Sequence, residues 1–216
     1  MRIARVLSLG GLTAPLWLAG SVIVSGFMRP EYNHIRQMIS ELGEFGAESS
    51  GFMSYVGLVV TGLLIFLFSL STFMRFPRSG KWIAASLAMA LAGLSVVIAG
   101  IFPCDPGCDV DSPSQAQLLH TVSAFLAFLL LIASSLLWSP RFRELRDWHP
   151  MSRFSVFAGV VTFVFLAGFF GLTDRSVAGL IQRLFLGLIL LCLGVFAVRL
   201  WLRWESIEDQ MTEGAA

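Results

Sequence analysis

Hydrophobic residues gather in six long stretches of the chain, separated by short polar connections. The stretches cover residues 6–28, 52–74, 82–102, 118–138, 154–172 and 177–198. Each has close to the roughly 20 residues that a helix rising about 1.5 Å per residue needs to cross a bilayer's hydrocarbon core. Five stretches lack charged residues and the sixth holds only Arg183, which predicts membrane helices because charge is costly at the bilayer centre. We therefore expect an all-α fold, a bundle of six transmembrane helices forming one domain over residues 1–203, with a tail at 204–216.

The polar connections alternate between basic and acidic along the chain. Eleven of the 15 Lys and Arg residues fall at the N-terminus, in the second and fourth connections and in the tail, whereas eight of the 14 acidic residues fall in the other three connections. Under the positive-inside rule, this asymmetry predicts a multi-pass protein of the cell membrane with the N-terminus and C-terminus in the cytoplasm. The first stretch is longer than the apolar core of a signal peptide and lacks a small-residue cleavage site, so we expect it to be retained as a helix.

Composition excludes several classes of protein. Hydrophobic residues make up 56% of the chain and charged residues only 13%, which is incompatible with a soluble domain of this size. The basic run 141–146 adjoins an apolar stretch, so we interpret it as a topology signal that contacts anionic lipids. The sequence contains no glycine-rich phosphate loop. The expected partners are membrane lipids and no nucleic acid, with a homo-oligomer left open.

Several tryptophan residues lie near the ends of the apolar stretches. They are Trp82, Trp138, Trp148 and Trp201. Because amphipathic aromatic rings favour the headgroup level of a bilayer, we predict that they anchor the helices at the interface and form no cofactor site.

Two of the three cysteines are the first and last residues of the segment Cys-Asp-Pro-Gly-Cys in the third connection. The charge pattern places Cys104 and Cys108 outside the cytoplasm, where disulfides persist. A disulfide between them would constrain a turn that Pro106 and Gly107 already favour. A redox pair or a metal site is the alternative, although redox motifs have two residues between the cysteines and not three. We expect the disulfide, and we interpret Cys192, inside the sixth stretch, as a packing residue.

The first connection contains a segment with helical periodicity, residues 33–45. Its apolar side chains recur along one side: Ile35, Met38, Ile39, Leu42 and Phe45. We predict a short helix that lies in the outer interface or at the mouth of the bundle and ends near Gly43. His34 and Glu41 would share one edge of this helix, and Ser40 would lie on another. A simple solvated polar face is the alternative interpretation.

Polar residues of three other segments favour a site over a solvated face. His120 opens the fourth stretch soon after a connection that contains Asp105, and Gln182 and Arg183 lie inside the sixth stretch. An arginine at that depth usually faces the bundle interior with a partner, and the candidate counter-charges on that side are acidic side chains. We therefore predict one polar site at the outer mouth of the bundle. Its central members are Glu41, Asp105, His120 and Arg183, supported by His34, Ser40 and Gln182.

Four short motifs resemble a known family. They are Ile-Ser-Glu-Leu-Gly at 39–43, Phe-Pro-Cys-Asp at 102–105, Leu-His at 119–120 and Gly-Leu-Ile-Gln-Arg at 179–183. Together they resemble the pattern of the DUF998 family of six-helix prokaryotic membrane proteins, over most of the chain. The Ser-Glu-Leu-Gly segment is also similar, more distantly, to a loop of the Frag/DRAM/Sfk membrane family, whose members are linked to lipid and GPI-anchor biology. The DUF998 resemblance implies a fold and a topology but no activity. It also suggests that six residues form one site: Ser40, Glu41, Asp105, His120, Gln182 and Arg183.

Three classes of function are compatible with such a site. The first is a non-enzymatic protein that binds a lipid or small amphiphile, with Arg183 pairing with an anionic head group while the apolar helices accept the chains. The second is an intramembrane hydrolase acting at the outer leaflet. Its zinc ligands would come from His34, His120, Glu41 and Asp105, or Glu41 and His120 would act as an acid–base pair. The third is a small transporter, which is disfavoured because the middle of each stretch is almost entirely apolar.

The two forms of the hydrolase hypothesis, with and without a metal, have equally little support from the sequence. A superfamily of seven-helix hydrolases that includes alkaline ceramidases uses comparable His and Asp ligands, but with a paired-His motif that this chain lacks. We therefore assign no metal ligands and no catalytic residues, and we leave the cofactor open. Amphiphile binding is the function that we favour from the sequence.

Overall fold

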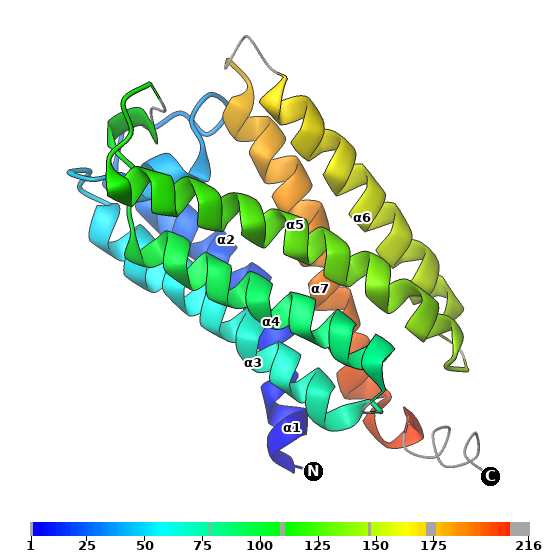
Figure 1. Ribbon diagram of the computed structural model, residues 1–216. Coiled ribbons are helices and arrows are strands. Elements are labelled where there is room, and N and C mark those ends of the chain that lie inside the picture. The colour runs from blue at the N-terminus through cyan, green and yellow to red at the C-terminus, as the bar shows by residue number, and fades with distance from the viewer. Residues whose placement is uncertain (1, 78, 109–110, 147, 172–175, 208–216) are drawn as a thin grey trace.

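The computed structural model describes residues 2–77, 79–108, 111–146, 148–171 and 176–207, and the regular structure within them is helical throughout (Figure 1). The elements in chain order are α1 (Arg2–Leu7), α2 (Gly10–Met28), η1 (Ile39–Gly43), η2 (Phe52–Val59), α3 (Val60–Arg75), α4 (Gly80–Ile101), η3 (Pro106–Cys108), α5 (Gln115–Arg143), α6 (His149–Phe170) and α7 (Ala178–Leu202). Segments η1 and η3 are 3-10 helices, and η2 is a π-helix that continues directly into α3. The predicted all-α fold is confirmed.

Six helical segments of the described chain are long and apolar enough to cross a membrane. They are Arg2–Met28, Phe52–Arg75, Gly80–Ile101, Gln115–Arg143, His149–Phe169 and Ala178–Leu202. Each coincides with one of the predicted stretches, and the protein is therefore a multi-pass membrane protein. The predicted end of the fifth stretch at residue 172 and the tail residues 208–216 lie outside the described residues. The start of the tail forms a helical turn in which Trp204 and Ile207 are buried in the core.

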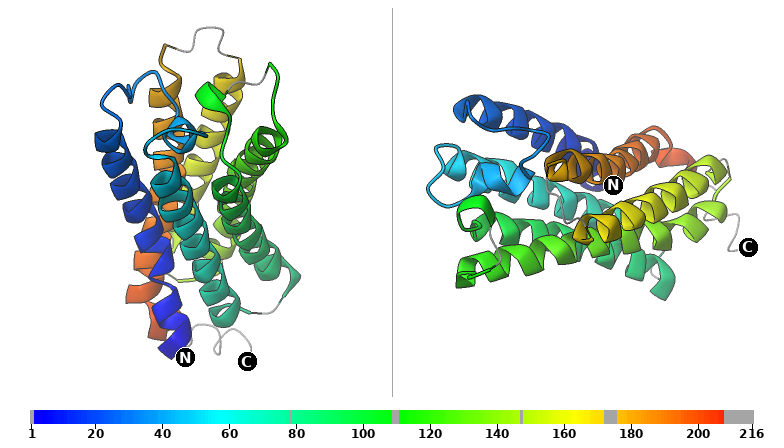
Figure 2. Two further views of the ribbon diagram at one scale, coloured as in Figure 1. Left: turned by 90° about the vertical axis from the view of Figure 1, so that its left-hand side faces the viewer. Right: turned by 90° about the horizontal axis from the view of Figure 1, so that it is seen from above.

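The six spanning helices form a ring in chain order. Each of α2 to α6 packs against the next helix, and contact between α2 and α7 closes the ring. The side and top views in Figure 2 show this arrangement. The start of α1 and the end of α7 lie at one end of the bundle, which we call the terminal end (Figure 1). The connections that follow α2, α4 and α6 lie at the opposite end, which we call the loop end.

Aromatic side chains fill the terminal half of the ring. The cluster consists of Phe76, Trp82, Trp138, Phe142, Trp148 and Phe196. The Trp138 ring centroid lies 4.9 Å from those of both Phe76 and Phe196. The prediction that Trp82, Trp138 and Trp148 anchor the helices at the interface is wrong, because these side chains are only 5%, 1% and 1% exposed. Short connections bring neighbouring helix ends together, so a residue near the end of one helix can face another helix in place of lipid.

The predicted helix over residues 33–45 forms only in part. Ile39–Gly43 is helical, as the short helix η1 between the first two spans, whereas the chain immediately before it forms turns. Asn33 starts a single turn, because its Oδ1 accepts hydrogen bonds from the backbone N–H groups at positions 35 and 36, at 3.0 and 3.1 Å. The turn does not continue as a helix, because the carbonyls at positions 35, 36 and 37 accept from residues of α7. His34 and Glu41 therefore do not lie on one helix, and their expected common edge does not exist.

The second span begins with the π-helix η2, whose wider turns alter the regular backbone hydrogen bonding. The Trp17 indole of α2 donates to the Val56 carbonyl at 2.7 Å, and the Ser54 hydroxyl donates to the carbonyl of Gly43 at 3.1 Å. Segment η2 thereby ties the end of η1 and the side of α2 to the same helix. This connection holds η1 across the loop end of the bundle.

Candidate functional site

The connection after α2 is fastened to the first turn of α7. The Gly179 N–H donates to the Arg36 carbonyl at 3.2 Å, and the Leu180 N–H donates to the Ile35 carbonyl at 2.9 Å. The first N–H groups of a helix have no acceptor within the helix, and here the loop carbonyls satisfy them. Gly179 has no space for a side chain, because a Cβ atom there would overlap the carbonyl of Gln37. The glycine therefore permits the close approach of the two segments.

Arg183 extends this attachment by one turn. Its Nη1 donates to the carbonyls of Gln37 and Gly179, both at 2.9 Å, while its Nη2 donates to the Tyr32 hydroxyl at 2.6 Å and lies 3.2 Å from His34 Nδ1. These four partners are uncharged acceptors. The expected pairing of Arg183 with an acidic side chain does not occur within the described part of the chain.

Burial and the Arg183 charge alter the titration of two neighbours at the loop end. Burial raises the pKa of the Tyr32 hydroxyl, and its hydrogen bond with Arg183 partly opposes that effect. Partial burial lowers the pKa of His34, and the adjacent Arg183 charge lowers it further. A neutral His34 ring presents Nδ1 as the acceptor that the Arg183 guanidinium requires.

Gln182 of α7 is hydrogen-bonded to the start of η1. Its Oε1 accepts a hydrogen bond from the Ile39 N–H at 2.6 Å. This bond fixes the orientation of the side-chain amide, because only the oxygen can accept. The Gln182 NH2 group has no hydrogen-bond partner among the described residues.

Glu41 is buried and its carboxylate is used locally. It accepts hydrogen bonds from the Met38 N–H at 2.7 Å and from the Gln37 amide at 3.0 Å, which closes η1 on itself. Its own backbone carbonyl accepts from Arg29 at 2.7 Å. The sequence analysis placed Glu41 among the central groups of the site, whereas its carboxylate oxygens stabilise the connection.

An ion pair between Arg29 and Glu44 was not predicted from the sequence. The Arg29 Nη2 lies 2.6 Å from Glu44 Oε1, and the second carboxylate oxygen accepts from the Gly107 N–H at 2.7 Å. The side chains are 24% and 8% exposed. Arg29 directly follows the first apolar stretch and is one of the few basic residues in the acidic connections, which was the available signal. This pair joins the connection after α2 to the one after α4.

Asp105 precedes α5 and stabilises its N-terminus through Ser114. Its two carboxylate oxygens accept from the Ser114 N–H at 2.8 Å and from the Ser114 hydroxyl at 2.7 Å, and these bonds lower the pKa of Asp105. Ser114 in turn caps α5 by accepting from the Gln117 N–H at 3.1 Å. A disulfide joins Cys104 and Cys108 on either side of this aspartate. Asp105 therefore holds the N-cap residue Ser114 in place.

His120 is one of the buried polar residues of α5, with 6% of its surface exposed. Its Nδ1 lies 2.8 Å from the Ala99 carbonyl and 3.0 Å from the Phe102 carbonyl, both at the end of α4. Carbonyl oxygens only accept, so Nδ1 carries the hydrogen. In the neutral ring, Nε2 is then an acceptor.

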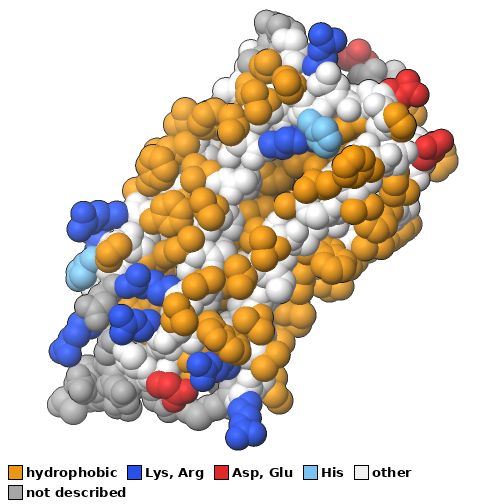
Figure 3. All heavy atoms as spheres, turned by 180° about the vertical axis from the view of Figure 1, so that it is seen from behind, with side chains coloured by type: hydrophobic (Ala, Val, Ile, Leu, Met, Phe, Trp, Pro, Cys, Tyr) orange, Lys and Arg blue, Asp and Glu red, His pale blue; other side chains and the backbone are white. Residues whose placement is uncertain are grey.

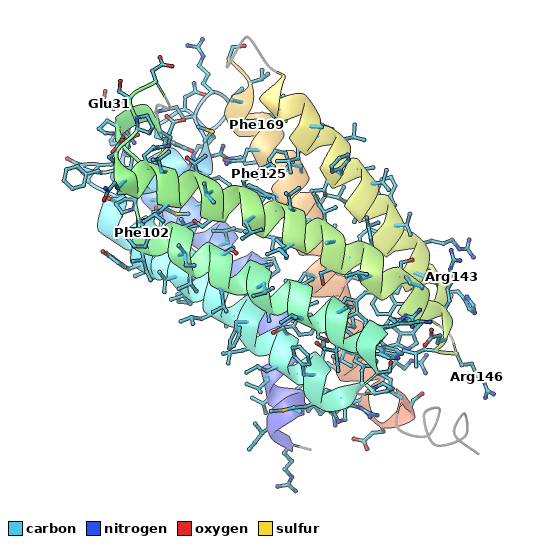
Figure 4. The ribbon with its side chains drawn as sticks, viewed as in Figure 1. Glu31, Phe102, Phe125, Arg143, Arg146 and Phe169 are labelled. Atoms are coloured by element: carbon cyan, nitrogen blue, oxygen red, sulfur yellow. A yellow bond between two sulfur atoms is a disulfide. The ribbon has the colours of Figure 1, made fainter. Side chains whose placement is uncertain are left out.

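A central cavity of about 320 Å³ lies inside the loop half of the ring, with η1 at its end. Side chains from all six spans line it, most of them apolar. Two of these, Phe125 on α5 and Phe169 on α6, lie toward the loop end in Figure 4. The polar residues that line the cavity are Ser40, Thr61, Gln117, His120, Thr121 and Gln182. The structure thus brings together Ser40, His120 and Gln182 of the predicted site, and adds Thr61, Gln117 and Thr121, which were not predicted from the sequence.

A second hollow, a lateral groove of about 1010 Å³, runs between α2 and α7. His34 and Arg183 line it toward the loop end, and Arg199 and Arg203 line it toward the terminal end. The face drawn in Figure 3 has hydrophobic side chains over its middle and Lys and Arg side chains toward both ends. The predicted single site is therefore divided. Ser40, His120 and Gln182 face the cavity and His34 and Arg183 face the groove, while Glu41 and Asp105 line neither.

The side chains that could bind zinc are also dispersed over the structure. Within the described residues, no three His, Cys, Asp or Glu side chains come close enough together to hold a metal ion.

Comparison with known proteins gives a family. The model of the family described as "Protein of unknown function (DUF998)" matches residues 12–199. The chain belongs to the DUF998 family. All of the residues that line the central cavity fall within the matched range, so the cavity lies in the part of the chain that defines DUF998. No curated protein and no solved structure matches the chain. The resemblance to the Frag/DRAM/Sfk family has no support from these comparisons.

Proposed function

We propose that this DUF998 protein binds a small amphiphile in the central cavity. The polar part of the ligand would lie toward Ser40, His120 and Gln182, and its chain would extend along the apolar walls. The observation that carries this proposal is the composition of the cavity, where five of the six polar side chains belong to η1 and to the first two turns of α5 and α7, while most of the other lining residues are apolar. The sixth, Thr61, donates its hydroxyl to the Gly57 carbonyl. A concave, mostly apolar pocket with a few converging polar groups is typical of small-molecule sites.

The polar groups would provide the selectivity. Lipid chains are as apolar as the cavity walls, so transfer of a chain from the bilayer into the cavity gives little net hydrophobic gain. A hydrogen bond formed inside the bundle, by contrast, has no competition from bulk water. The ligand would therefore be distinguished from bulk lipid mainly by its head group.

We further propose that the loop end is extracytoplasmic. Arg2, Arg5 and Lys81 and the basic residues after α5 belong to the terminal end, whereas Glu31, Glu41 and Glu44 belong to the loop end. The positive-inside rule then favours cytoplasmic termini. The disulfide at the loop end supports the same orientation, because disulfides persist in oxidising compartments. The cavity would accordingly receive its ligand from the outer leaflet.

Binding from one side is better supported than transport across the bilayer. A transporter usually has polar groups or broken helices near the bilayer midplane. Here the aromatic cluster around Trp138 and Phe196 fills the terminal half of the ring. The cavity accordingly lies in the loop half and ends before this cluster.

A variant that fills the cavity tests the proposal. Ala124 lines the cavity, so Ala124→Phe should occupy its space, whereas Ala167→Phe on an exposed position of α6 adds the same group outside it. Native mass spectrometry would measure how much medium-chain monoacylglycerol each purified protein retains. We expect Ala124→Phe to weaken binding about tenfold or more, equivalent to at least about 1.4 kcal/mol, and Ala167→Phe to bind like the wild type. Equal binding by wild type and Ala124→Phe would overturn the proposal.

A further inference from the structure

The polar end of the cavity carries no formal charge. Its polar lining consists of hydroxyls, side-chain amides and one imidazole. The nearest cation in the sequence, Arg183, lines the groove between α2 and α7 and uses its Nη1 and Nη2 groups on loop acceptors. A charged head group placed among uncharged groups in an apolar bundle would lack a counter-charge, which is costly. The cavity therefore favours an uncharged ligand.

Two groups at this end offer one fixed hydrogen-bonding role each, and the roles are opposite. The Ser40 and Thr121 hydroxyls, which also line the cavity, can either donate or accept. His120 uses its Nδ1–H on the carbonyls of α4, which leaves Nε2 as an acceptor. Gln182 uses its Oε1 on the Ile39 N–H, which leaves its NH2 group as a donor. Gln117 is occupied at both ends, since its Oε1 accepts from the Asp105 N–H at 2.8 Å and its amide nitrogen donates to the Thr121 hydroxyl at 2.9 Å. A complementary ligand must bring a hydroxyl for His120 and a carbonyl for Gln182.

The size of the cavity narrows the class further. Its volume of about 320 Å³ lies at the lower end of the roughly 300–1,000 Å³ that small-molecule pockets occupy. This space suits one chain with a compact head and excludes most of a two-chain phospholipid.

We propose that the ligand is a neutral single-chain amphiphile that carries a hydroxyl beside a carbonyl, as in a monoacylglycerol. The hydroxyl donates to His120 Nε2, and the ester carbonyl accepts from the Gln182 amide. This assignment rests on the proposed function, because it concerns the same cavity. It adds a head-group class that the binding of an unspecified amphiphile does not require.

A ligand series of one chain length separates the contributions of the head group. The probes are a medium-chain monoacylglycerol, the methyl ester, which keeps the carbonyl but lacks the hydroxyl, and the free fatty acid, which is charged. Native mass spectrometry of the full-length protein in one detergent would rank their binding. We expect the monoacylglycerol to bind about tenfold or more tightly than the other two. A fatty acid that binds as tightly as the monoacylglycerol, or a methyl ester that does so, would overturn the assignment.

Two substitutions of His120 test the role of Nε2. In His120→Asn, the amide nitrogen can replace Nδ1 as donor to the Ala99 and Phe102 carbonyls, but the acceptor is lost. In His120→Gln, the side-chain oxygen can replace Nε2 as the acceptor. We expect His120→Asn to weaken monoacylglycerol binding about tenfold without changing methyl ester binding, and His120→Gln to restore much of the loss. Equal weakening of both probes in His120→Asn would mean a packing role and would overturn the assignment.

Gln182→Glu provides the complementary change. The carboxylate can still accept from the Ile39 N–H but no longer offers a donor. We expect both the monoacylglycerol and the methyl ester to bind less tightly, because each carries the carbonyl. Unchanged binding of both probes would overturn the role of Gln182. The thermal unfolding midpoint of each variant would verify that it is folded.

The cavity-filling variant keeps the two proposals distinguishable. If Ala124→Phe abolishes binding but the head groups are not discriminated, amphiphile binding stands and the monoacylglycerol-like class falls. If all probes bind equally to wild type and Ala124→Phe, both proposals fall, because the ligand is then held elsewhere.

Discussion

Replacing Gly179 with alanine should loosen the connection after α2 from α7. The added Cβ would overlap the Gln37 carbonyl, and both segments at this contact are held by backbone hydrogen bonds. Overpacking of this kind costs about 1–3 kcal/mol. Loss of the bonds from Gly179 and Leu180 to the loop adds about 0.5–1.5 kcal/mol each, and the higher helix propensity of alanine offsets about 1 kcal/mol. We expect Gly179→Ala to lower the free energy of unfolding by about 2–3 kcal/mol, within the range that these contributions span.

Gly187 supplies a matched control on the same helix. A Cβ atom at Gly187 would meet no atom within 4 Å, so Gly187→Ala should be neutral or stabilise the protein by up to about 1 kcal/mol through helix propensity alone. Unfolding by sodium dodecyl sulfate in mixed micelles, followed by far-ultraviolet circular dichroism, would measure both variants. Hydrogen exchange should also become faster in residues 35–39 of Gly179→Ala only. If the two variants have the same stability and exchange, the close contact at Gly179 does not hold the connection, and our reasoning is refuted.

Three further changes test the fastening of the loop end. Glu44→Gln should destabilise the protein by about 3 kcal/mol because it leaves Arg29 partly buried without its ion pair; the double variant with Arg29→Met should recover part of that loss in a denaturant titration. Replacing Cys104 and Cys108 with serine should lower the free energy of unfolding by about 2 kcal/mol, because the disulfide no longer restricts the short loop in the unfolded chain. Reductant should destabilise the wild type by the same amount and leave the serine variant unchanged. Burial lowers the pKa of His34 below its ordinary value of 6.5. The stabilisation that the neutral His34 ring provides is therefore complete above pH 6.5 and is lost as the pH falls through the lowered pKa. The thermal unfolding midpoint of the wild type should therefore fall on acidification. The midpoint of His34→Asn, which keeps an acceptor beside Arg183, should fall less. Parallel pH profiles of the two proteins would contradict this prediction.

The membrane spans could be predicted from the sequence because the bilayer imposes a strict rule on length and charge. Positions within the bundle follow no such rule. Trp138 stands near the end of its stretch, where either lipid headgroups or a neighbouring helix could surround it, and the 4.9 Å separation from the Phe196 ring depends on how two distant helices meet. The turn after Asn33 is a similar case. Its neighbours have helical periodicity, but the carbonyls at positions 35–37 accept hydrogen bonds from α7, a long-range contact that the periodicity does not reveal.

The site was predicted in part for a related reason. Arg183 was correctly expected to have partners. From the sequence, the expected partners were acidic side chains, whereas the observed ones are uncharged acceptors such as the Gln37 carbonyl and the Tyr32 hydroxyl. Backbone carbonyls occur at every residue and leave no mark in a sequence. His120 and Gln182 were identified because they interrupt apolar stretches. Their open donor and acceptor groups became visible only when the partners of Nδ1 and Oε1 were known.

Three acidic residues of the loop end, Glu41, Glu44 and Asp105, have a common structural use that separates them from the cavity. Glu41 accepts from the Met38 N–H, Glu44 from the Gly107 N–H, and Asp105 from the Ser114 N–H. Each of these donors lies outside the long helices, in the connection after α2 or the one after α4, and a buried or constrained N–H needs an acceptor. A carboxylate satisfies it strongly and has a second oxygen for another donor. These three carboxylates thus serve to fold two connections, those after α2 and α4, while the uncharged His120 and Gln182 face the cavity. Substitutions of the acids should therefore act mainly on stability, and substitutions of the neutral pair mainly on ligand binding.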